Sequence, residues 1–436
     1  MSLQQQTVEE ALGSKISRGP APSAATAAWP PRLPVPGLVR SSWPTWASGA
    51  VFLVVTLIAQ RSTVTGHRTE TGDFAADSLR SQHAWSQVDG VFSRWGYHHP
   101  GPLLLWIKDL SETALAPLGL DPTGAQVVGT ALVATVALVT LGLALAVASR
   151  SPWCGPAVLA LALVGLPDGV VLVPWGPVVG NWFLVLGVAG LVAAAHGARW
   201  GVPVAAAGAC GLVHLHVLFL PLAGVIALAA LSLVLRRDPT GAALRRPSVA
   251  LATGAVLAAG TAPLLVALVR GTSPWAAYLR VSQNAGASPT AYPWSTGLAR
   301  TGALYAPGMA AQDVALVGTG ALFAVAVVVL SGWLALRGTR AGTRVVGAAG
   351  LISTAFLLGV SRMDFLTPET IGRVVPVVVL AGMVAEVAAR ARPAWAPATA
   401  ALAVAALLAV GLGRPPVEVA RRGSAAWQRR SRVRPR

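Results

Sequence analysis

The chain has 436 residues, of which 54% are hydrophobic and 11% are charged, and its mean hydropathy is +0.64. This composition excludes a fold around one soluble core and predicts an all-α polytopic membrane protein. A formal net charge of +17 would suggest a nucleic-acid partner in a soluble protein. Here the arginines cluster in the breaks between apolar stretches, where they set topology and meet anionic lipid head groups. We therefore expect no nucleic-acid partner.

A helix needs roughly 20 apolar residues to cross the hydrocarbon of a membrane, and the chain offers about ten or eleven such stretches. We expect residues 43–412 to form one polytopic domain. Residues 1–42 hold no apolar run long enough for a span or a signal sequence, so we predict a disordered cytoplasmic tail. Residues 413–436 are predicted to form a basic, disordered tail. An odd number of spans places that tail outside, whereas a re-entrant third or fifth stretch would make it cytoplasmic.

The predicted spans alternate with arginine-rich breaks, which favours a cytoplasmic N-terminus and puts every second connection outside. Two of these outer connections are long and cover residues 61–121 and 270–312. In chain order, the predicted spans are residues 43–60, 123–147, 154–166, 182–198, 202–216, a stretch ending at Arg236, 249–269, stretches ending at Arg337, near Arg362 and at Arg390, and 394–412.

The segment 100–118 in the first outer connection is apolar at its start but then carries Lys108, Asp109 and Glu112. These charges make it too polar for a span exposed to lipid. Lys108 and Glu112 have the spacing of neighbours on one helical face. The sequence therefore predicts an interfacial helix that lies along the membrane surface.

Polar chemistry is concentrated between residues 72 and 106, in the first outer connection. The whole chain has only 16 Asp and Glu residues, yet Asp73, Asp77 and Asp89 lie close together here. Ionisable residues beside a membrane-embedded domain are candidates for function. The cationic and imidazole side chains of the same stretch are Arg80, Arg94, His83, His98 and His99.

The stretch matches the pattern D-x-A, then G-x-x-S-R-x-G, an aromatic residue and x-H-P-G-P-L. The matching residues are Asp73, Ala75, Gly90, Ser93, Arg94, Gly96, Tyr97, His99, Pro100, Gly101, Pro102 and Leu103. With the interfacial helix that follows, this resembles the GT-C superfamily of polyprenyl-phosphate-sugar-dependent glycosyltransferases, in its actinobacterial branch. That superfamily includes protein mannosyltransferases, aminoarabinose transferases and arabinosyltransferases.

The resemblance implies a GT-C-like integral-membrane enzyme of the plasma membrane, with its active site facing outward. Such an enzyme transfers a sugar from a polyprenyl-phosphate donor to a glycan, glycolipid or protein acceptor of the cell envelope. The alternative is a polytopic transporter or a flippase for lipids or lipid-linked sugars. A transporter more often shows an inverted repeat and charged positions near mid-membrane, and the chain shows neither.

The resemblance implies that an aspartate early in the first outer connection is the catalytic base, which takes a proton from the acceptor hydroxyl. Asp73 matches that position, and Asp77, one helical turn later, is the second candidate. The alternative for Asp73 is a cap of a short surface helix, because G-D-F-A-A-D-S-L is also a helix-start signal.

Cationic groups are needed to hold the leaving phosphate of such a donor. Arg94, His98 and His99 are candidates for this contact or for orienting the acceptor; the alternative is that the histidines are interfacial polar residues without a direct role. Two adjacent histidines near aspartates also suggest a divalent metal. Adjacent residues on a helix or strand point apart, so we do not favour a metal and predict no certain cofactor.

Two later elements follow the family pattern, LVHLHVLFLPL with His214 and His216, and SRMDF with Arg362. On a regular helix the two histidines lie about 200° apart, so only one of them could face the site. Arg280, Arg300 and Arg362 are predicted on the outer side, against the usual topological bias. A lipid phosphate would explain them; the alternative is that they snorkel to lipid head groups.

Overall fold

The protein is described here by a computed structural model, which describes residues 42–65, 81, 84, 100–166, 172–271, 293–305, 314–362, 372 and 374–390. All of them belong to one unit, Ser42–Arg436. The elements in these ranges are helices, and none is a strand. In residues 302–305 and 314–320 only the backbone is described. The predicted tails and the last predicted span, 394–412, lie outside the described residues.

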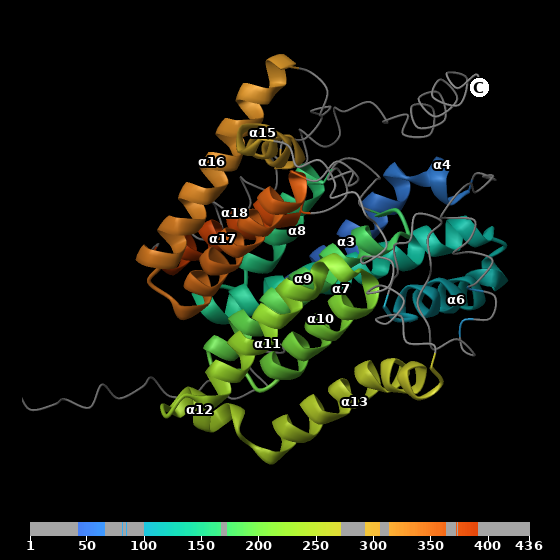
Figure 1. Ribbon diagram of the computed structural model, residues 1–436, viewed down its shortest axis with the longest axis horizontal. Coiled ribbons are helices and arrows are strands. Elements are labelled where there is room, and N and C mark those ends of the chain that lie inside the picture. Colours follow the sequence, from blue (N-terminus) through green and yellow to red (C-terminus); the bar gives the residue numbers. More distant parts are fainter. Residues whose placement is uncertain are drawn as a thin grey trace, which may run out of the picture. The chain divides into compact units, whose positions relative to one another are not determined.

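The helices are numbered as in Figure 1. In chain order they are α3 (Trp43–Ala59), α4 (Arg61–Val64), α6 (Leu103–Leu115), η2 (Ala116–Leu118), α7 (Pro122–Ser149), α8 (Cys154–Gly165), α9 (Gly176–Ala195), α10 (Gly201–Leu215), η4 (Val217–Phe219), α11 (Leu220–Leu235), α12 (Pro239–Leu244), α13 (Pro247–Val269), α15 (Trp294–Tyr305), α16 (Val314–Arg337), α17 (Ala341–Ser361) and α18 (Val374–Arg390).

Five helical stretches in the described part are long and apolar enough to cross a membrane, namely α7, α9, η4 with α11, α13 and α17. Shorter apolar helices accompany them, among them α3, α8 and α10. This is the helix content of an all-α membrane protein. The predicted bounds of the spans agree closely with α3, α7, α8, α10 and α13.

One predicted bound is wrong, and one helix was not predicted. The span predicted to begin at residue 182 begins at Gly176, because Pro177 stands in the first turn of α9, where its missing N–H costs no hydrogen bond. The second outer connection, 270–312, contains the helix α15. A search for apolar spans misses this helix because its sequence, WSTGLARTGALY, alternates polar and apolar residues.

Helix α9 is the centre of the described bundle and contacts α7, α10, α11, α17 and α18 (Figure 1). In its apolar window 89% of the residues are buried inside the protein, against 11% in that of α13. Trp182 of α9 is among the largest fully buried side chains. A helix that is apolar all round belongs in the interior of a bundle, and α9 occupies that place.

Small residues bring α9 and α10 into backbone contact. Gly187 and Gly190 of α9 face Gly208 and Ala205 of α10, and a Cβ added at Gly208 would collide with the backbone of Gly187. The hydrophobic effect does not drive helices together within lipid, so close van der Waals packing between small residues holds them instead. The contact therefore depends on the absence of side chains at these glycines.

The C-terminal end of α9 meets the start of α17 through His196. The Nε2 atom of His196 accepts a hydrogen bond of 3.0 Å from the backbone N–H of Gly342. The positive charges of Arg340 and Arg150, from the start of α17 and the end of α7, act on the same imidazole. The ends of three helices therefore converge at His196, and we call this end of the bundle the basic end.

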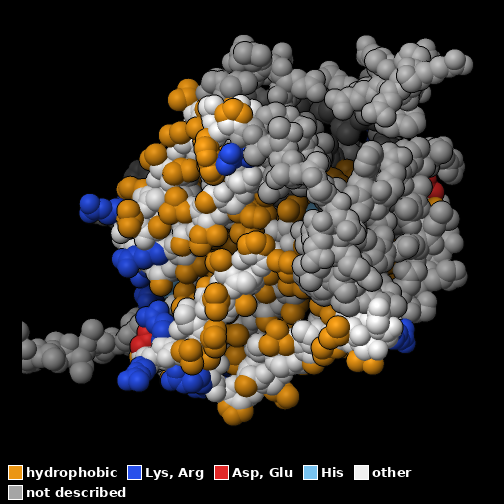
Figure 2. Space-filling model, in the orientation of Figure 1, with side chains coloured by type: hydrophobic (Ala, Val, Ile, Leu, Met, Phe, Trp, Pro, Cys, Tyr) orange, Lys and Arg blue, Asp and Glu red, His pale blue; other side chains and the backbone are white. Residues whose placement is uncertain are grey.

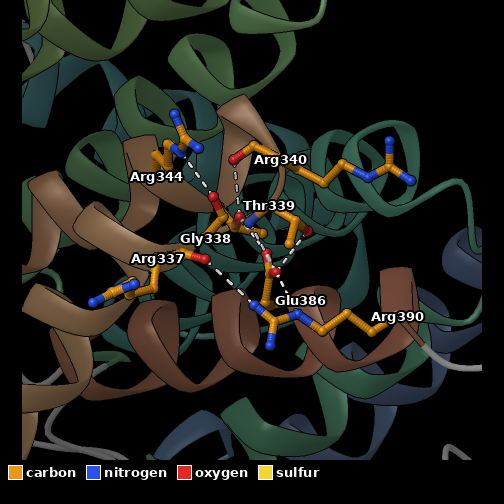
Figure 3. A network of polar contacts seen from close by, with 8 residues as sticks. Arg337, Gly338, Thr339, Arg340, Arg344, Glu386 and Arg390 are labelled. Atoms are coloured by element: carbon orange, nitrogen blue, oxygen red, sulfur yellow. Dashed lines mark hydrogen bonds and ion pairs between the residues drawn. The ribbon is translucent and has the colours of Figure 1, made fainter.

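A second polar contact at the basic end fastens α18 to the turn between α16 and α17. The carboxylate of Glu386 is 1% exposed. It accepts hydrogen bonds from the backbone N–H of Thr339 at 2.9 Å, from the hydroxyls of Thr339 and Thr343 at 2.6 Å each, and from Nε of Arg390 at 2.9 Å (Figure 3). A buried charge is tolerated when its lone pairs are satisfied in this way.

The distribution of charged side chains on the surface also distinguishes the basic end from the rest of the bundle. Figure 2 shows hydrophobic side chains over most of the described face, with the Lys and Arg side chains gathered mainly along one edge. That edge is where Figure 1 places α12 and the turn between α16 and α17. An apolar girdle with cations concentrated at one end is the pattern that the positive-inside rule describes for membrane proteins.

We expect Gly208→Ala to lower the free energy of unfolding by roughly 1–3 kcal/mol, because its methyl group would force α9 and α10 apart. The matched control is Gly224→Ala in α11, where a Cβ would meet nothing within 4 Å. That change should be neutral or stabilising by up to about 1 kcal/mol, since alanine favours a helix. Thermal unfolding of the purified proteins in detergent measures both. Equal stability of the two variants would contradict the close contact.

Stability should fall in mild acid because of His196. Burial, together with the charges of Arg340 and Arg150, lowers the pKa of His196 from 6.5 to about 4. Between these values the unfolded chain binds more protons than the folded one, so the stability that is present above pH 6.5 is lost as the pH falls toward 4. From about pH 7 to about pH 5, His196 should account for a loss of about 2 kcal/mol.

The measurement is the same thermal unfolding at the two pH values, with His196→Gln as the comparison. Glutamine can accept the Gly342 hydrogen bond but does not titrate. The acid-dependent loss should therefore be smaller in the variant by that amount. An identical loss in both proteins would show that His196 is not the group responsible.

Candidate functional site

The candidate site lies at the end of the bundle away from the basic end, where the predicted first outer connection, residues 61–121, meets the helices. The candidates from the sequence that fall within the described part of the chain are His214, His216, Arg300 and Arg362. The other predicted site residues, which lie outside the described residues, are Asp73, Asp77, Arg94, His98, His99 and Arg280.

The Pro-Gly-Pro turn of the first outer connection packs on the end of α10. The N–H of Gly101 donates a hydrogen bond of 3.1 Å to the carbonyl of His214. A Cβ on Gly101 would overlap the imidazole ring of His214. That ring is buried, and its Nε2 forms a hydrogen bond with the carbonyl of Gly260 in α13. His214 therefore joins the first connection, α10 and α13 at one point.

His216 ends α10 instead of continuing it. Its backbone is extended, with φ −164° and ψ 136°, so α10 stops at Leu215. The Nδ1 atom of His216 accepts a hydrogen bond of 3.2 Å from the N–H of Leu218 and so caps η4. The ring also meets Phe219 edge-on, with 6.4 Å between the centroids. His214 and His216 thus do not share a regular helix, and the expected angle of about 200° between them does not apply.

Apolar packing supports the same junction. Leu104 of α6, Val179 of α9 and Leu215 of α10 form one buried cluster. Leu103 begins α6 directly after the Pro-Gly-Pro turn, and Leu104 is the second residue of this helix. The end of the first outer connection is therefore anchored to the centre of the bundle.

A polar contact then ties an earlier part of the first connection to α6 and α7. Glu112 of α6 accepts hydrogen bonds from the Ser81 hydroxyl at 3.1 Å and from the Gln126 amide at 2.7 Å. Trp106 donates to the carbonyl of Ala84 at 3.0 Å. Burial raises the pKa of Glu112, although the hydrogen bonds from Gln126 and Ser81 oppose this. Residues 81 and 84 are thereby held against α6.

The structure shows which way the charged face of α6 points. Lys108 is fully buried, and Ser111 on the same face is buried as well. Glu112 of this face bonds to Gln126 of α7, so the charged face of α6 packs inward. The outward face is instead marked by Leu110, which is exposed.

Sequence reasoning missed Asn181 because its segment was expected to be a loop. Asn181 is buried in the second turn of α9. Its Oδ1 accepts a hydrogen bond of 2.9 Å from the N–H of Gly372, and its Nδ2 donates to the carbonyl of Pro177 at 3.2 Å. Gly372 has φ +94°, a conformation that favours glycine. The sequence signal that could have identified Asn181 is its position as the one amide in the apolar run GPVVGNWF. A lone polar residue in an apolar helix needs a hydrogen-bond partner.

Arg362 forms a second group of site residues with α15. Its guanidinium carbon lies 3.9 Å from the centroid of the Trp294 ring, which is an arrangement for cation–π attraction. Beside this pair, the hydroxyl of Thr301 donates to that of Ser361 at 3.1 Å. Stacking uses the face of a guanidinium, while its hydrogen-bond donors lie in its plane. The structure thus pairs Arg362, which the sequence had suggested for the site, with an aromatic side chain of α15.

Within the described ranges, no group of three or more His, Cys, Asp or Glu residues is placed to hold a metal ion. The metal hypothesis concerned His98, His99 and the neighbouring aspartates, which lie outside those ranges. Comparisons of the chain with protein-family models, with curated proteins and with solved structures find no match.

We expect Gly101→Ala to destabilise the protein by roughly 1–3 kcal/mol, because its Cβ and the His214 ring would occupy the same space. Removing the ring should make room for it. In a His214→Ala background the same change should therefore cost much less, with a coupling of about 1 kcal/mol or more. Gly254→Ala, where a Cβ meets nothing within 4 Å, is the control. Thermal unfolding of the four members of the cycle measures the coupling, and additive effects would contradict the contact.

Proposed function

We propose that this chain is an integral-membrane glycosyltransferase that transfers a sugar from a polyprenyl-phosphate donor to a cell-envelope acceptor on the outer face. The observation that supports it best is the contact between Gly101 and His214. These residues come from the first-loop motif and from the later histidine element, two parts of the family pattern that are far apart in the sequence. Their contact places both elements in one region.

The proposed orientation follows from the basic end. If the positive-inside rule applies, that end faces the cytoplasm and the junction of Gly101 with His214 faces outward. The proposal includes about ten or eleven spans and a cytoplasmic N-terminus, of which five long apolar stretches lie in the described part. The acceptor would be a glycan, glycolipid or protein, which an outward-facing site can reach.

The proposed reaction is a single displacement at the anomeric carbon of the donor sugar. Asp73 takes the proton of the acceptor hydroxyl as its oxygen bonds to that carbon, and the bond from carbon to the phosphate oxygen breaks. The polyprenyl phosphate leaves with the bonding electron pair. Its negative charge is held by cations, for which Arg94, His98 and His99 are the candidates in the first connection.

Arg362 is the proposed phosphate ligand for which the structure supplies geometry. Its stacking on Trp294 fixes the plane of the guanidinium. A planar donor group of fixed orientation is suited to two parallel hydrogen bonds with phosphate oxygens. Trp294 itself is 59% exposed, as expected for an aromatic residue near the membrane–water interface.

The test is transfer of radiolabelled sugar from polyprenyl-phosphate donors into endogenous acceptors, using membranes that contain the protein. Asp73→Asn should lower transfer by roughly 10²–10⁴-fold, because it removes the general base. Asp109→Asn is the matched control, since Asp109 lies on α6 in the same outer connection and has no proposed role. That variant should keep full activity at equal protein level.

Asp77→Asn distinguishes the two candidate bases. If Asp77→Asn alone abolishes transfer, the base is one turn later than proposed. If both variants keep full transfer, the first-loop aspartates are structural. If wild-type membranes transfer no sugar but move lipid-linked sugar between leaflets, the glycosyltransferase proposal fails and the flippase alternative takes its place.

A further inference from the structure

Helix α15 meets the end of α17 with one face. Trp294, Gly297 and Thr301 are spaced by three and four residues, so they lie on the same side of this helix. Each of them lies against Ser361 or Arg362, the last residue of α17 and its C-cap. Figure 1 shows α15 beside α16, and it contacts α17 as well. One face of α15 is therefore built around the arginine that is proposed to bind phosphate.

The absent side chain of Gly297 makes room for the stem of Arg362. A Cβ at this glycine would lie 2.7 Å from Cγ of Arg362 and 3.4 Å from the carbonyl oxygen of Leu358. Carbon atoms that touch without a bond are about 3.5–4.0 Å apart. Any side chain at position 297 would therefore push the arginine away from its present place.

A buried pair of hydroxyl groups fixes the register of α15 on α17. Thr301 and Ser361 are both fully buried, and a hydrogen bond of 3.1 Å joins their hydroxyls. Sliding of one helix along the other would separate this buried pair, which is costly. Ser361 directly precedes Arg362, so the point at which the arginine leaves α17 is fixed relative to α15.

The third contact holds the guanidinium group itself. Trp294 is 59% exposed, so burial in the core does not explain its position. Its ring lies under the guanidinium of Arg362, whose central carbon is 3.9 Å from the ring centroid. An arginine side chain loses rotational freedom when it binds a ligand. Less of this freedom is lost on binding when the group is already held in place.

The same kind of support already serves to bind an oxyanion at the basic end. The guanidinium of Arg390 lies over the ring of Trp333, 5.0 Å from its centroid. Its Nε donates a hydrogen bond of 2.9 Å to the carboxylate of Glu386 (Figure 3). An aromatic ring thus supports the face of the arginine while a donor in its plane meets the anion. Arg362 on Trp294 repeats this support where the proposed function requires a phosphate to be held.

We propose that Trp294, Gly297 and Thr301 are positioning residues, which hold Arg362 for the phosphate of a polyprenyl-phosphate donor. This inference rests on the proposed function and deepens it, because it gives a role to α15, a helix that the sequence did not predict. The three residues act through Arg362 and need no contact with the donor themselves.

The test measures binding of polyprenyl phosphate, the product that transfer leaves, to the purified full chain in detergent by native mass spectrometry. Polyprenol, which lacks the phosphate, shows any general change in lipid binding. Arg362→Gln should lower the affinity for polyprenyl phosphate by roughly 10–100-fold, because it removes hydrogen bonds from a charged donor. Trp294→Leu should lower it by roughly two- to fivefold, the size of an exposed cation–π contact. Neither change should alter the affinity for polyprenol.

The double variant Trp294→Leu with Arg362→Gln decides whether the tryptophan acts through the arginine. If it does, the double variant binds polyprenyl phosphate no more weakly than Arg362→Gln alone. A further loss in the double variant would mean that Trp294 contacts the ligand itself, which would overturn the positioning role. Trp294→Phe keeps an aromatic face and should retain most of the affinity.

Gly297→Ala tests the space that is left for the arginine stem. Its methyl group should displace Arg362 and lower the affinity for polyprenyl phosphate by a factor similar to that of Trp294→Leu. Gly359→Ala is the matched control on α17, since a Cβ there meets nothing within 4 Å, and it should leave the affinity unchanged. Thermal unfolding identifies a variant that is not folded. Trp294→Leu, at an exposed position, decides the question if Gly297→Ala does not fold.

Failure of this inference can be told apart from failure of the proposed function. Unchanged binding in Trp294→Leu, together with a loss in Arg362→Gln, would overturn the positioning role and leave the proposed reaction untouched. If wild-type protein shows the expected coupling but transfers no sugar, the phosphate site stands and the proposed reaction fails. If wild-type protein binds polyprenyl phosphate no better than polyprenol, Arg362 is not a phosphate ligand and the positioning role fails with it.

Discussion

The contact between α9 and α10 is the constraint on which the rest of the described bundle depends. Gly190 and Gly208 let the two backbones touch, and this contact sets the alignment of the residues on either side of it. His196, at one end of α9, meets the start of α17. Asn181, near the other end, meets the turn before α18. One closely packed pair thus positions helices that come much later in the chain.

The candidate site is assembled by backbone contacts as much as by side chains. Gly101 contributes an N–H and an empty position where a side chain would be, and His214 fills that space with its ring. Farther along the predicted first outer connection, the carboxylate of Glu112 accepts hydrogen bonds from Ser81 and Gln126. The first connection is therefore fastened to the bundle at separate points on either side of the segment that carries the histidine pair of the motif.

Much of the helical bundle could be predicted from the sequence, because apolar stretches bounded by arginines leave little choice of secondary structure in a membrane. The start of α9 and the helix α15 could not be predicted. A proline stands in the first turn of α9, and α15 contains too many polar residues for an apolar span. The inward packing of the α6 face that carries Lys108 and Glu112 was missed because the partner of Glu112, Gln126, lies on another helix. Predictions for Asp73 and the histidine pair rest on the motif, which fixes residue types but not their distances.

The hydrogen bond between Asn181 and Gly372 has a consequence for how the chain is made. Its partners are 191 residues apart. At the usual rate of synthesis, roughly 10–40 s separate the appearance of Asn181 from that of Gly372. During this interval the Oδ1 atom of Asn181 lies in an apolar helix without its final donor, the backbone N–H of Gly372. A buried amide oxygen without a donor is costly, so this part of α9 reaches its final hydrogen bonding only after most of the chain has been made.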